Sequence, residues 1–139
     1  MLNKILAALA LTVFACSAMA VTSYDAQGRR LSTYRQSGSS VNQYDSQGRR
    51  TATIRESSSG YNVYDAQGRR TGSFEERSNG RMDEYDAQGR RTASYRTDSL
   101  GNTVKTDEYG RRVATFKKDS LGNITEYDSQ GRRVRTFRE

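Results

Sequence analysis

Apolar residues are sparse after residue 20, and the large ones recur at a constant distance from a set of glycines. Six positions after each of these glycines stands Tyr34, Ile54, Phe74, Tyr95, Phe116 or Phe137. The segments that contain them, such as residues 132–137, are rich in Thr, Val and aromatic residues. This composition is typical of β-strands, whose side chains alternate between two faces.

The glycines mark six tandem repeats, because their spacings are 20, 20, 21, 21 and 21 residues. They are Gly28, Gly48, Gly68, Gly89, Gly110 and Gly131. An Asp stands three positions before each glycine and an arginine pair follows it, and five copies place a Tyr before the Asp. The fifth copy departs, because it reads Thr106-Asp107-Glu108-Tyr109 before its glycine. Repetition with this period indicates a repeat architecture.

Each repeat contains two turn signals. The Asp-x-x-Gly sequence predicts a type I turn followed by a glycine with positive φ, which closes a hairpin with a bulge. A second signal, such as Ser58-Ser59-Gly60 or Leu100-Gly101-Asn102, predicts the turn to the next copy. Glycine about every ten residues leaves windows too short for a packed helix. The sequence therefore predicts an all-β fold, an antiparallel meander of tandem β-hairpins that forms an open curled sheet.

Counting with a period of two through the last copy assigns side chains to two faces. One face carries Tyr127, Arg133, Arg135 and Phe137, and the other carries Asp128, Arg132, Val134 and Thr136. The first face is the candidate core, an aromatic stripe interrupted by small residues. Only 33% of the chain is hydrophobic, so we expect the sheet to curl on this face or to lie against a partner. Intrinsic disorder is the alternative that this polar composition leaves open.

The first twenty residues differ from the rest. Residues 1–4 include Lys4, residues 5–15 form an uncharged apolar run, and Ala18-Met19-Ala20 is a small-x-small cleavage pattern. Such a run is too short to cross a hydrocarbon core of roughly 30 Å as a helix. We expect a secretory signal peptide over residues 1–20 with cleavage before Val21, and a repeat domain over residues 21–139. The protein is therefore expected to be exported, either periplasmic or secreted.

The only cysteine, Cys16, lies inside this segment. If the segment is removed, the mature chain has no thiol, which excludes disulfides and thiolate chemistry. The alternative is a lipoprotein signal, because Val13-Phe14-Ala15-Cys16 loosely resembles a lipobox, in which Phe14 is a poor fit. In that case Cys16 would be acylated and would tether the protein to a membrane.

The charge of the mature chain is positive, because removing Lys4 leaves 23 − 1 = 22 basic residues against 16 acidic ones, or +6. An exported basic protein meets polyanions other than nucleic acid. The expected partners are an anionic glycan, lipopolysaccharide or another envelope protein, with membrane contact only through a lipidated Cys16. The edges of an open sheet add self-association as a further possibility.

The residues needed for most catalytic sites are missing from the sequence. There is no histidine, which excludes Ser-His-Asp and Cys-His arrangements and His-ligated metal sites. One Asp in each repeat forms a ladder, and no segment matches a calcium-binding loop. The acidic pairs Glu75-Glu76 and Asp83-Glu84 are expected to be solvated strand charges. We expect neither an enzyme nor a cofactor or metal site.

The arginine doublets are the candidate chemistry, since they supply 12 of the 22 mature basic residues. Adjacent strand residues point to opposite faces, so the doublets predict one arginine column on each face. Guanidinium groups beside Tyr suit sulfate, phosphate or carboxylate groups. The structural alternative is that each arginine stacks on a Tyr or pairs with an Asp. The tentative ligand-binding residues are the second arginines: Arg30, Arg50, Arg70, Arg91, Arg112 and Arg133.

The Tyr-Asp-x-x-Gly-Arg pattern with Gly-Asn turns, as in residues 85–90 and 122–132, resembles the YD repeats of RHS proteins and teneurins. The resemblance covers residues 24–139. It implies β-hairpin repeats that, in long proteins, spiral into a hollow shell that encapsulates a toxin or mediates cell-surface contact and carbohydrate binding. We therefore expect too few copies to enclose cargo and no additional domain. This chain's second arginine also stands where the family commonly has an apolar residue.

Three hypotheses of function follow from these patterns. The first is a non-catalytic exported repeat protein with a structural or interaction role in the bacterial envelope. The second is a binder of anionic glycan or lipopolysaccharide through the repeated arginine columns. The third is a secretion- or competition-associated factor that resembles RHS proteins.

Overall fold

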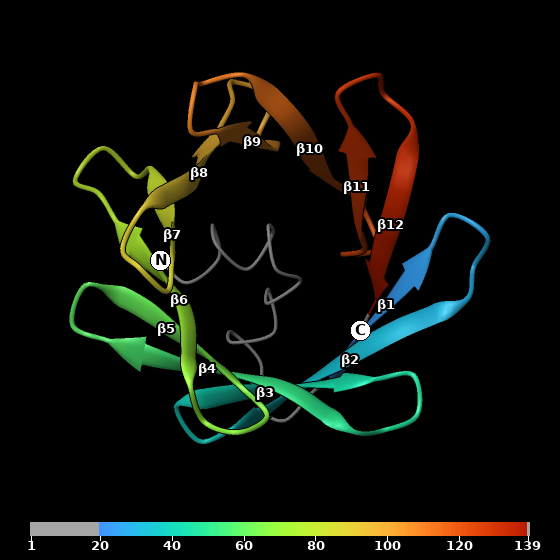
Figure 1. Cartoon of the computed structure of the whole chain (residues 1–139). Helices are drawn as coiled ribbons and strands as arrows, with labels where there is room; N and C mark the ends of the chain where they lie inside the picture. Colours follow the sequence, from blue (N-terminus) through green and yellow to red (C-terminus); the bar gives the residue numbers. More distant parts are fainter. Residues whose placement is uncertain (1–19, 139) are drawn as a thin grey trace.

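The computed structural model describes residues 20–138, which form twelve β-strands arranged as a ring (Figure 1). The strands are β1 (Ala20–Asp25), β2 (Arg30–Ser37), β3 (Ser40–Asp45), β4 (Arg50–Ser57), β5 (Gly60–Asp65), β6 (Arg70–Glu76), β7 (Met82–Asp86), β8 (Arg91–Thr97), β9 (Thr103–Asp107), β10 (Arg112–Lys118), β11 (Ile124–Asp128) and β12 (Arg133–Arg138). Each repeat contributes one hairpin, and each strand pairs antiparallel with its neighbours in sequence. The predicted all-β antiparallel hairpin meander is confirmed.

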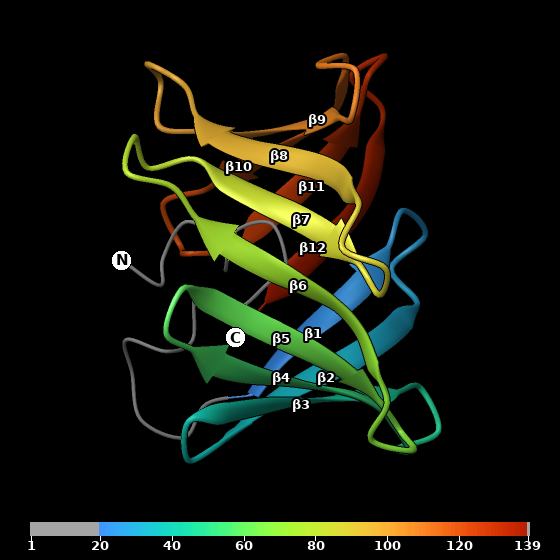
Figure 2. The ribbon, with the colours of Figure 1, turned by 60° about the vertical axis from the view of Figure 1, so that its left-hand side comes forward.

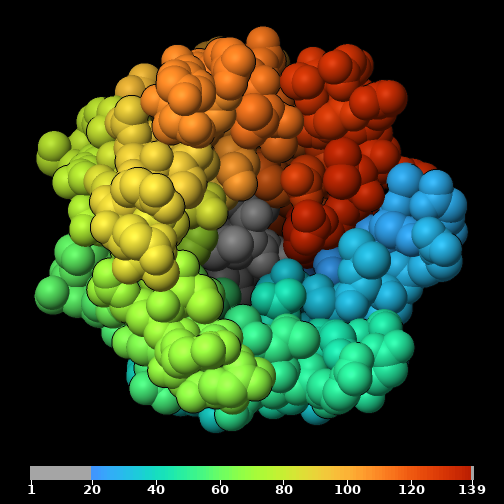
Figure 3. All heavy atoms as spheres, in the orientation of Figure 1, coloured from blue at the N-terminus to red at the C-terminus, as the bar shows by residue number. Residues whose placement is uncertain are grey.

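The sheet is a closed barrel, so the prediction of an open curled sheet is wrong. Strands β1 and β12 pair antiparallel, with Thr22 opposite Arg138 and Tyr24 opposite Thr136. Figure 1 shows the blue start of the ring beside its red end, and the space-filling view in Figure 3 shows the same closure. Strand twist and bulges both curve a sheet, and every hairpin here contains one bulge. Summed over six hairpins, this curvature brings the first and last strands together.

The bulge also changes which face the repeated tyrosines occupy. In the last hairpin the register shifts between Glu126 and Tyr127, so that Glu126 faces Arg135 across the strands while Tyr127 lies opposite Arg133. Glu126 therefore shares the inward face with Phe137, and Tyr127 points outward. The expectation that Tyr127 and Phe137 share an aromatic core stripe is wrong, because a simple count of two does not include the extra residue of the bulge.

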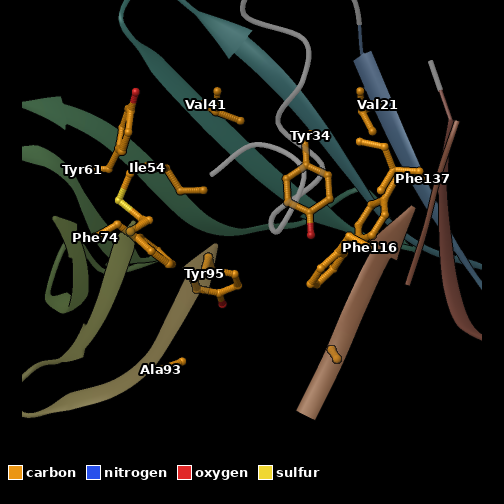
Figure 4. Close-up of a cluster of buried hydrophobic side chains, with 13 residues drawn as sticks. Val21, Tyr34, Val41, Ile54, Tyr61, Phe74, Ala93, Tyr95, Phe116 and Phe137 are labelled. Atoms are coloured by element: carbon orange, nitrogen blue, oxygen red, sulfur yellow. The ribbon is translucent and has the colours of Figure 1, made fainter. Parts of the chain in front are cut away.

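The inward face contains a continuous layer of large side chains (Figure 4). In this layer Tyr61 lies opposite Phe74 and Ile124 lies opposite Phe137, and all four side chains are buried. The rings of Phe74 and Tyr95 are tilted relative to each other with centroids 6.2 Å apart. Full burial of one such side chain contributes about 1.5–3 kcal/mol. The layer therefore supplies the core that the sequence could place only on a thin aromatic stripe.

A second inward layer lies closer to the Asp-x-x-Gly turns and contains charged side chains in the half of the ring from β7 to β12. From β7 to β12 it contains the ion pairs Glu84–Lys105, at 3.4 Å, and Glu126–Arg135, at 3.0 Å. In the corresponding pair of the first hairpin, Ser23 and Ser32 hydrogen-bond at 2.7 Å. Arg135 occupies the position where other copies have a small residue, and its partner Glu126 explains how a charge is accommodated there.

The predictions about the signal peptide over residues 1–20 and about Cys16 concern residues outside the described part, except for Ala20, which begins β1. Within residues 20–138, the free sheet edges on which self-association was predicted are paired with each other. Edge-to-edge association therefore loses its structural basis.

Closure can be tested by a disulfide across the β1–β12 seam. In a Cys16→Ser background, Thr22→Cys with Arg138→Cys should oxidise within one chain, because opposed antiparallel residues have Cα atoms about 4.5–5.5 Å apart. Non-reducing electrophoresis and mass spectrometry of the monomer report the bond. The control pair, Thr22→Cys with Lys117→Cys, places the second thiol on β10, which does not pair with β1, and should not oxidise internally. Equal behaviour of the two pairs would contradict closure.

Candidate functional site

Alternate turns of a meander lie at opposite ends of the barrel, so all six Asp-x-x-Gly-Arg-Arg segments gather at one end. We call this end the arginine rim; it comprises residues 25–30, 45–50, 65–70, 86–91, 107–112 and 128–133. It contains 12 of the 23 basic residues and 7 of the 16 acidic ones, the latter being six Asp and Glu108. The rim therefore carries 12 − 7 = +5 of the formal net charge of +7.

The first arginine of each doublet belongs to its own turn. In the first copy, Asp25 Oδ1 accepts the backbone N–H groups of Gln27 and Arg29 at 2.9 and 2.8 Å. Its Oδ2 accepts Nε–H of Arg29 at 2.7 Å, and the same three contacts recur in every copy. The turn glycines have φ of 79–82°, which L side chains rarely adopt. Between 73% and 77% of these arginine side chains stays exposed, so their terminal nitrogens face solvent.

The second arginines, which the sequence marked as tentative ligand-binding residues, are all exposed at the rim. They are Arg30, Arg50, Arg70, Arg91, Arg112 and Arg133. Nη2 of Arg30 donates to the carbonyl of Ser46 at 2.7 Å, which lies in the turn of the next repeat. Arg133 makes the equivalent contact with Ala26 at 3.1 Å and so joins the last repeat to the first. The doublets therefore form one ring at the rim, and the prediction of one column on each face is wrong.

The barrel wall carries a second regular feature, in which a cation covers each outward tyrosine. Arg35 lies over Tyr44 with its guanidinium carbon 5.5 Å from the ring centroid, and Arg138 lies over Tyr24 at 5.4 Å. Tyr64, Tyr85 and Tyr127 are covered in the same way by Arg55, Arg77 and Lys117 at 5.2–5.9 Å. The sequence suggested that doublet arginines would stack on these rings, but the covering cations come from elsewhere on the strands.

The turn carboxylates hold their charge strongly. The backbone N–H of Arg49 is the largest factor that lowers the pKa of Asp45, followed by its side-chain hydrogen bond, with burial acting in the opposite direction. The pKa values of Asp25, Asp65, Asp86 and Asp128 are lowered for the same reasons. These Asp residues therefore stabilise the turns as anions and are already occupied by donors.

The prediction that Asp83 is a solvated strand charge is wrong, because only 1% of this residue is exposed. Its carboxylate accepts hydrogen bonds from Ser94 Oγ at 2.6 Å and from Arg77 and Arg81 at 3.0 Å. Burial raises the pKa of Asp83, but these three donors outweigh burial and hold the pKa below its usual value. The charge of Asp83 is thus balanced by the two arginines, and these contacts hold the start of β7 in place.

The sequence interpretation predicted two turns at the far end of the barrel from their Gly-Asn signals, but it missed the Asp that stabilises each of them. Asp98 accepts N–H of Leu100 and Asn102 at 2.9 Å, and Asp119 repeats the arrangement with Leu121 and Asn123. These turns use the same Asp-x-x-Gly signal, but an Asn replaces the arginine that follows. These two turns therefore add no arginine to the far end, unlike the turns of the rim.

Among residues 20–138, no group of three His, Cys, Asp or Glu side chains is arranged to hold a metal ion. The same residues contain no helix with the length and apolarity required to traverse a bilayer.

Comparisons with known proteins add little. No family model matches the sequence, and no curated protein matches it. Alternansucrase in complex with isomaltononaose is a similar solved structure, with 23% identity, 81% of this chain and 9% of that chain covered, and a TM-score of 0.25. At that TM-score the likeness supports no argument about fold or function. The resemblance to YD repeats therefore stays a prediction.

The lowered pKa values predict how stability depends on pH. A carboxyl whose folded pKa is lowered stabilises the fold above its unfolded value, 3.8 for Asp, and loses this effect as pH falls through the folded pKa. Melting temperature by circular dichroism should therefore be flat from pH 7 to about pH 5 and fall below about pH 4. The triple variant Asp45→Asn, Asp65→Asn, Asp128→Asn keeps the amide oxygen acceptor but cannot titrate there, so its acid-induced loss should be smaller. A parallel loss in both proteins would exclude these turns as the cause.

Proposed function

We propose that this chain is a non-catalytic binding protein of the bacterial envelope, and that its arginine rim binds an anionic glycan, such as the phosphorylated saccharide of lipopolysaccharide. The observation that carries the proposal is the concentration of +5 net charge at one end of the barrel. The turn Asp residues cannot neutralise this charge, since each is matched by the first arginine of its own copy. The second arginine of each copy is thus in excess.

The geometry of the rim supports multivalent binding. Guanidinium groups suit phosphate and carboxylate because their planar forks donate two hydrogen bonds to one anion. Each doublet sits on a rigid turn held by three contacts to one Asp, so the groups are spaced by the repeat and not by flexible segments. A repeated ring of this kind favours a ligand that itself carries repeated negative charges.

An envelope location is part of the proposal and rests on the apolar run and cleavage pattern at residues 1–20. The absence of histidine from the sequence supports a non-catalytic role, because the common nucleophile–base pairs cannot form. In the same proposal, export brings the rim into contact with surface polysaccharides and not with nucleic acid.

The test replaces the second arginines that make no recorded hydrogen bond within residues 20–138, so that turn geometry is preserved. The variant Arg50→Gln, Arg70→Gln, Arg112→Gln should elute from immobilised heparin at lower salt and bind lipopolysaccharide more weakly. For a polyanion with the charge density of DNA, the loss of three contacts should reduce the slope of log K against log salt by about 2–3.

The matched control removes three exposed cations from the barrel wall toward the far end, through Arg35→Gln, Lys117→Gln and Arg138→Gln. It changes net charge equally and should keep more of the heparin retention. Circular dichroism melts of both variants show whether the barrel is intact. Equal loss in the two variants would mean that retention depends on net charge alone and would overturn the assignment to the rim.

A further inference from the structure

Adjacent hairpins meet along outward grooves, and in one of these grooves a threonine stands in place of the repeated tyrosine. This groove lies between β8 and β9, which are neighbours in both Figure 1 and Figure 2. Its walls include Arg91, Arg96, Val104 and Thr106, and its volume is about 520 Å³. This is within the range of roughly 300–1,000 Å³ that is usual for small-ligand sites.

The equivalent groove between β12 and β1 shows what is missing. Its lining residues Arg133, Thr136 and Arg138 correspond to Arg91, Ser94 and Arg96, but Tyr24 occupies the place of Thr106. The ring of Tyr24 lies under Arg138 at 5.4 Å, and the remaining volume is about 150 Å³. The groove between β6 and β7 keeps its tyrosine, Tyr85, and still has a volume of about 400 Å³. The feature that distinguishes the β8–β9 groove is therefore the threonine at the tyrosine position, and not its volume alone.

The tyrosine of the fifth copy does not refill this space. Tyr109 stands three positions later, in the turn, where its side chain is 75% exposed and stacks on Arg111 at 5.1 Å. Within residues 20–138, no aromatic ring is found under Arg96, although the corresponding cations of four other copies each cover one. In the remaining copy that position is Glu75, and Arg77 covers the tyrosine instead. Arg96 is thus left exposed beside a slot, defined as the space around Thr106 that the tyrosine ring occupies in other copies.

The walls of the slot are fixed. Arg81 is held at one end by its hydrogen bond to buried Asp83, at 3.0 Å. Thr106 donates its hydroxyl to the carbonyl of Ser94 at 3.4 Å, and Arg91 makes a long contact with the carbonyl of Glu108, also at 3.4 Å. The lining contains three arginines but only two Asp residues, Asp98 and Asp107. Both carboxylates already accept hydrogen bonds from N–H groups of their own turns. A ligand with an aromatic ring and a negative group would fit this slot, because the ring can stack under Arg96 and the negative group can offset the excess positive charge of the lining.

We propose that the β8–β9 groove binds a phenol-type aromatic ring, supplied either by a small aromatic carboxylate or by a tyrosine side chain of a peptide. The ring lies under Arg96, over Val104 and Thr106, in the position that the repeat's own tyrosine fills elsewhere. The groove shares Arg91 with the rim, but its defining residue, Thr106, lies outside the rim, so a substitution there tests this site without removing a rim arginine.

The test is a titration followed by the backbone amide signals of the ¹⁵N-labelled protein. 4-Hydroxyphenylacetate and the capped peptide Gly-Tyr-Gly probe the two sources, and cyclohexylacetate has similar volume and charge to the first but no aromatic face. The aromatic acid should shift signals of β8 and β9 saturably, with a Kd on the order of millimolar. Cyclohexylacetate should bind about 2–5-fold more weakly, as expected for loss of a cation–π contact. Saturable binding of the peptide but not of the aromatic acid would identify the ligand as a tyrosine side chain of a protein, and would still support recognition of a phenol-type ring.

Two variants distinguish binding in the slot from non-specific binding elsewhere on the protein. Thr106→Tyr restores the residue of the other copies and should abolish the shifts, while heparin retention stays unchanged. Tyr24→Thr opens the matching slot under Arg138 and should create new saturable shifts on β12 and β1. No saturable shift with either aromatic probe, equal affinity for cyclohexylacetate, or binding that survives Thr106→Tyr would each overturn the proposal.

Discussion

A shift of register just before each Asp-x-x-Gly turn governs the architecture of this protein. The extra residue turns the tyrosine outward in the five copies that have it, while the large apolar residue of the returning strand stays inward, as with Tyr127 and Phe137. The same extra residue bends and twists its hairpin. Six such increments accumulate in one rotational sense, and the barrel closes with β1 against β12. Core, outer wall and closure therefore all depend on one local irregularity repeated six times.

The bulge also explains how so polar a chain forms a packed structure. Its large apolar side chains are gathered in one inward layer, and the outward tyrosines remain half-buried because long cationic side chains lie across them, as Arg55 does over Tyr64. The aliphatic stems of Arg and Lys remove aromatic surface from water while their charged groups stay hydrated. The barrel thus shields apolar surface on both faces of a single sheet.

The sequence predicted the hairpins, because turn chemistry is local and Asp-x-x-Gly specifies it residue by residue. Closure was not predicted, because it depends on curvature summed over twelve strands, which no single repeat encodes. The outward position of Tyr127 was missed for a related reason, since the location of the bulge decides the face. Burial of Asp83 depends on Arg77 and Arg81, which lie on either side of a turn and fold back over it. By contrast, the sequence predicted the turn after Asp98, and the role of Asp98 itself could also have been predicted, since its Asp-x-x-Gly signal is the same as that of the rim.

The contact from Arg133 to Ala26 has a topological meaning. It is the same contact that Arg30 makes with Ser46, yet it joins residues from opposite ends of the described chain. Repeats six and one are therefore related just as repeats one and two are, and the ring has an approximate rotational symmetry in which no hairpin is intrinsically the first. The closing interface between β12 and β1 thus repeats the contacts of the interfaces between hairpins that are consecutive in the chain, although only the latter are joined by a short turn.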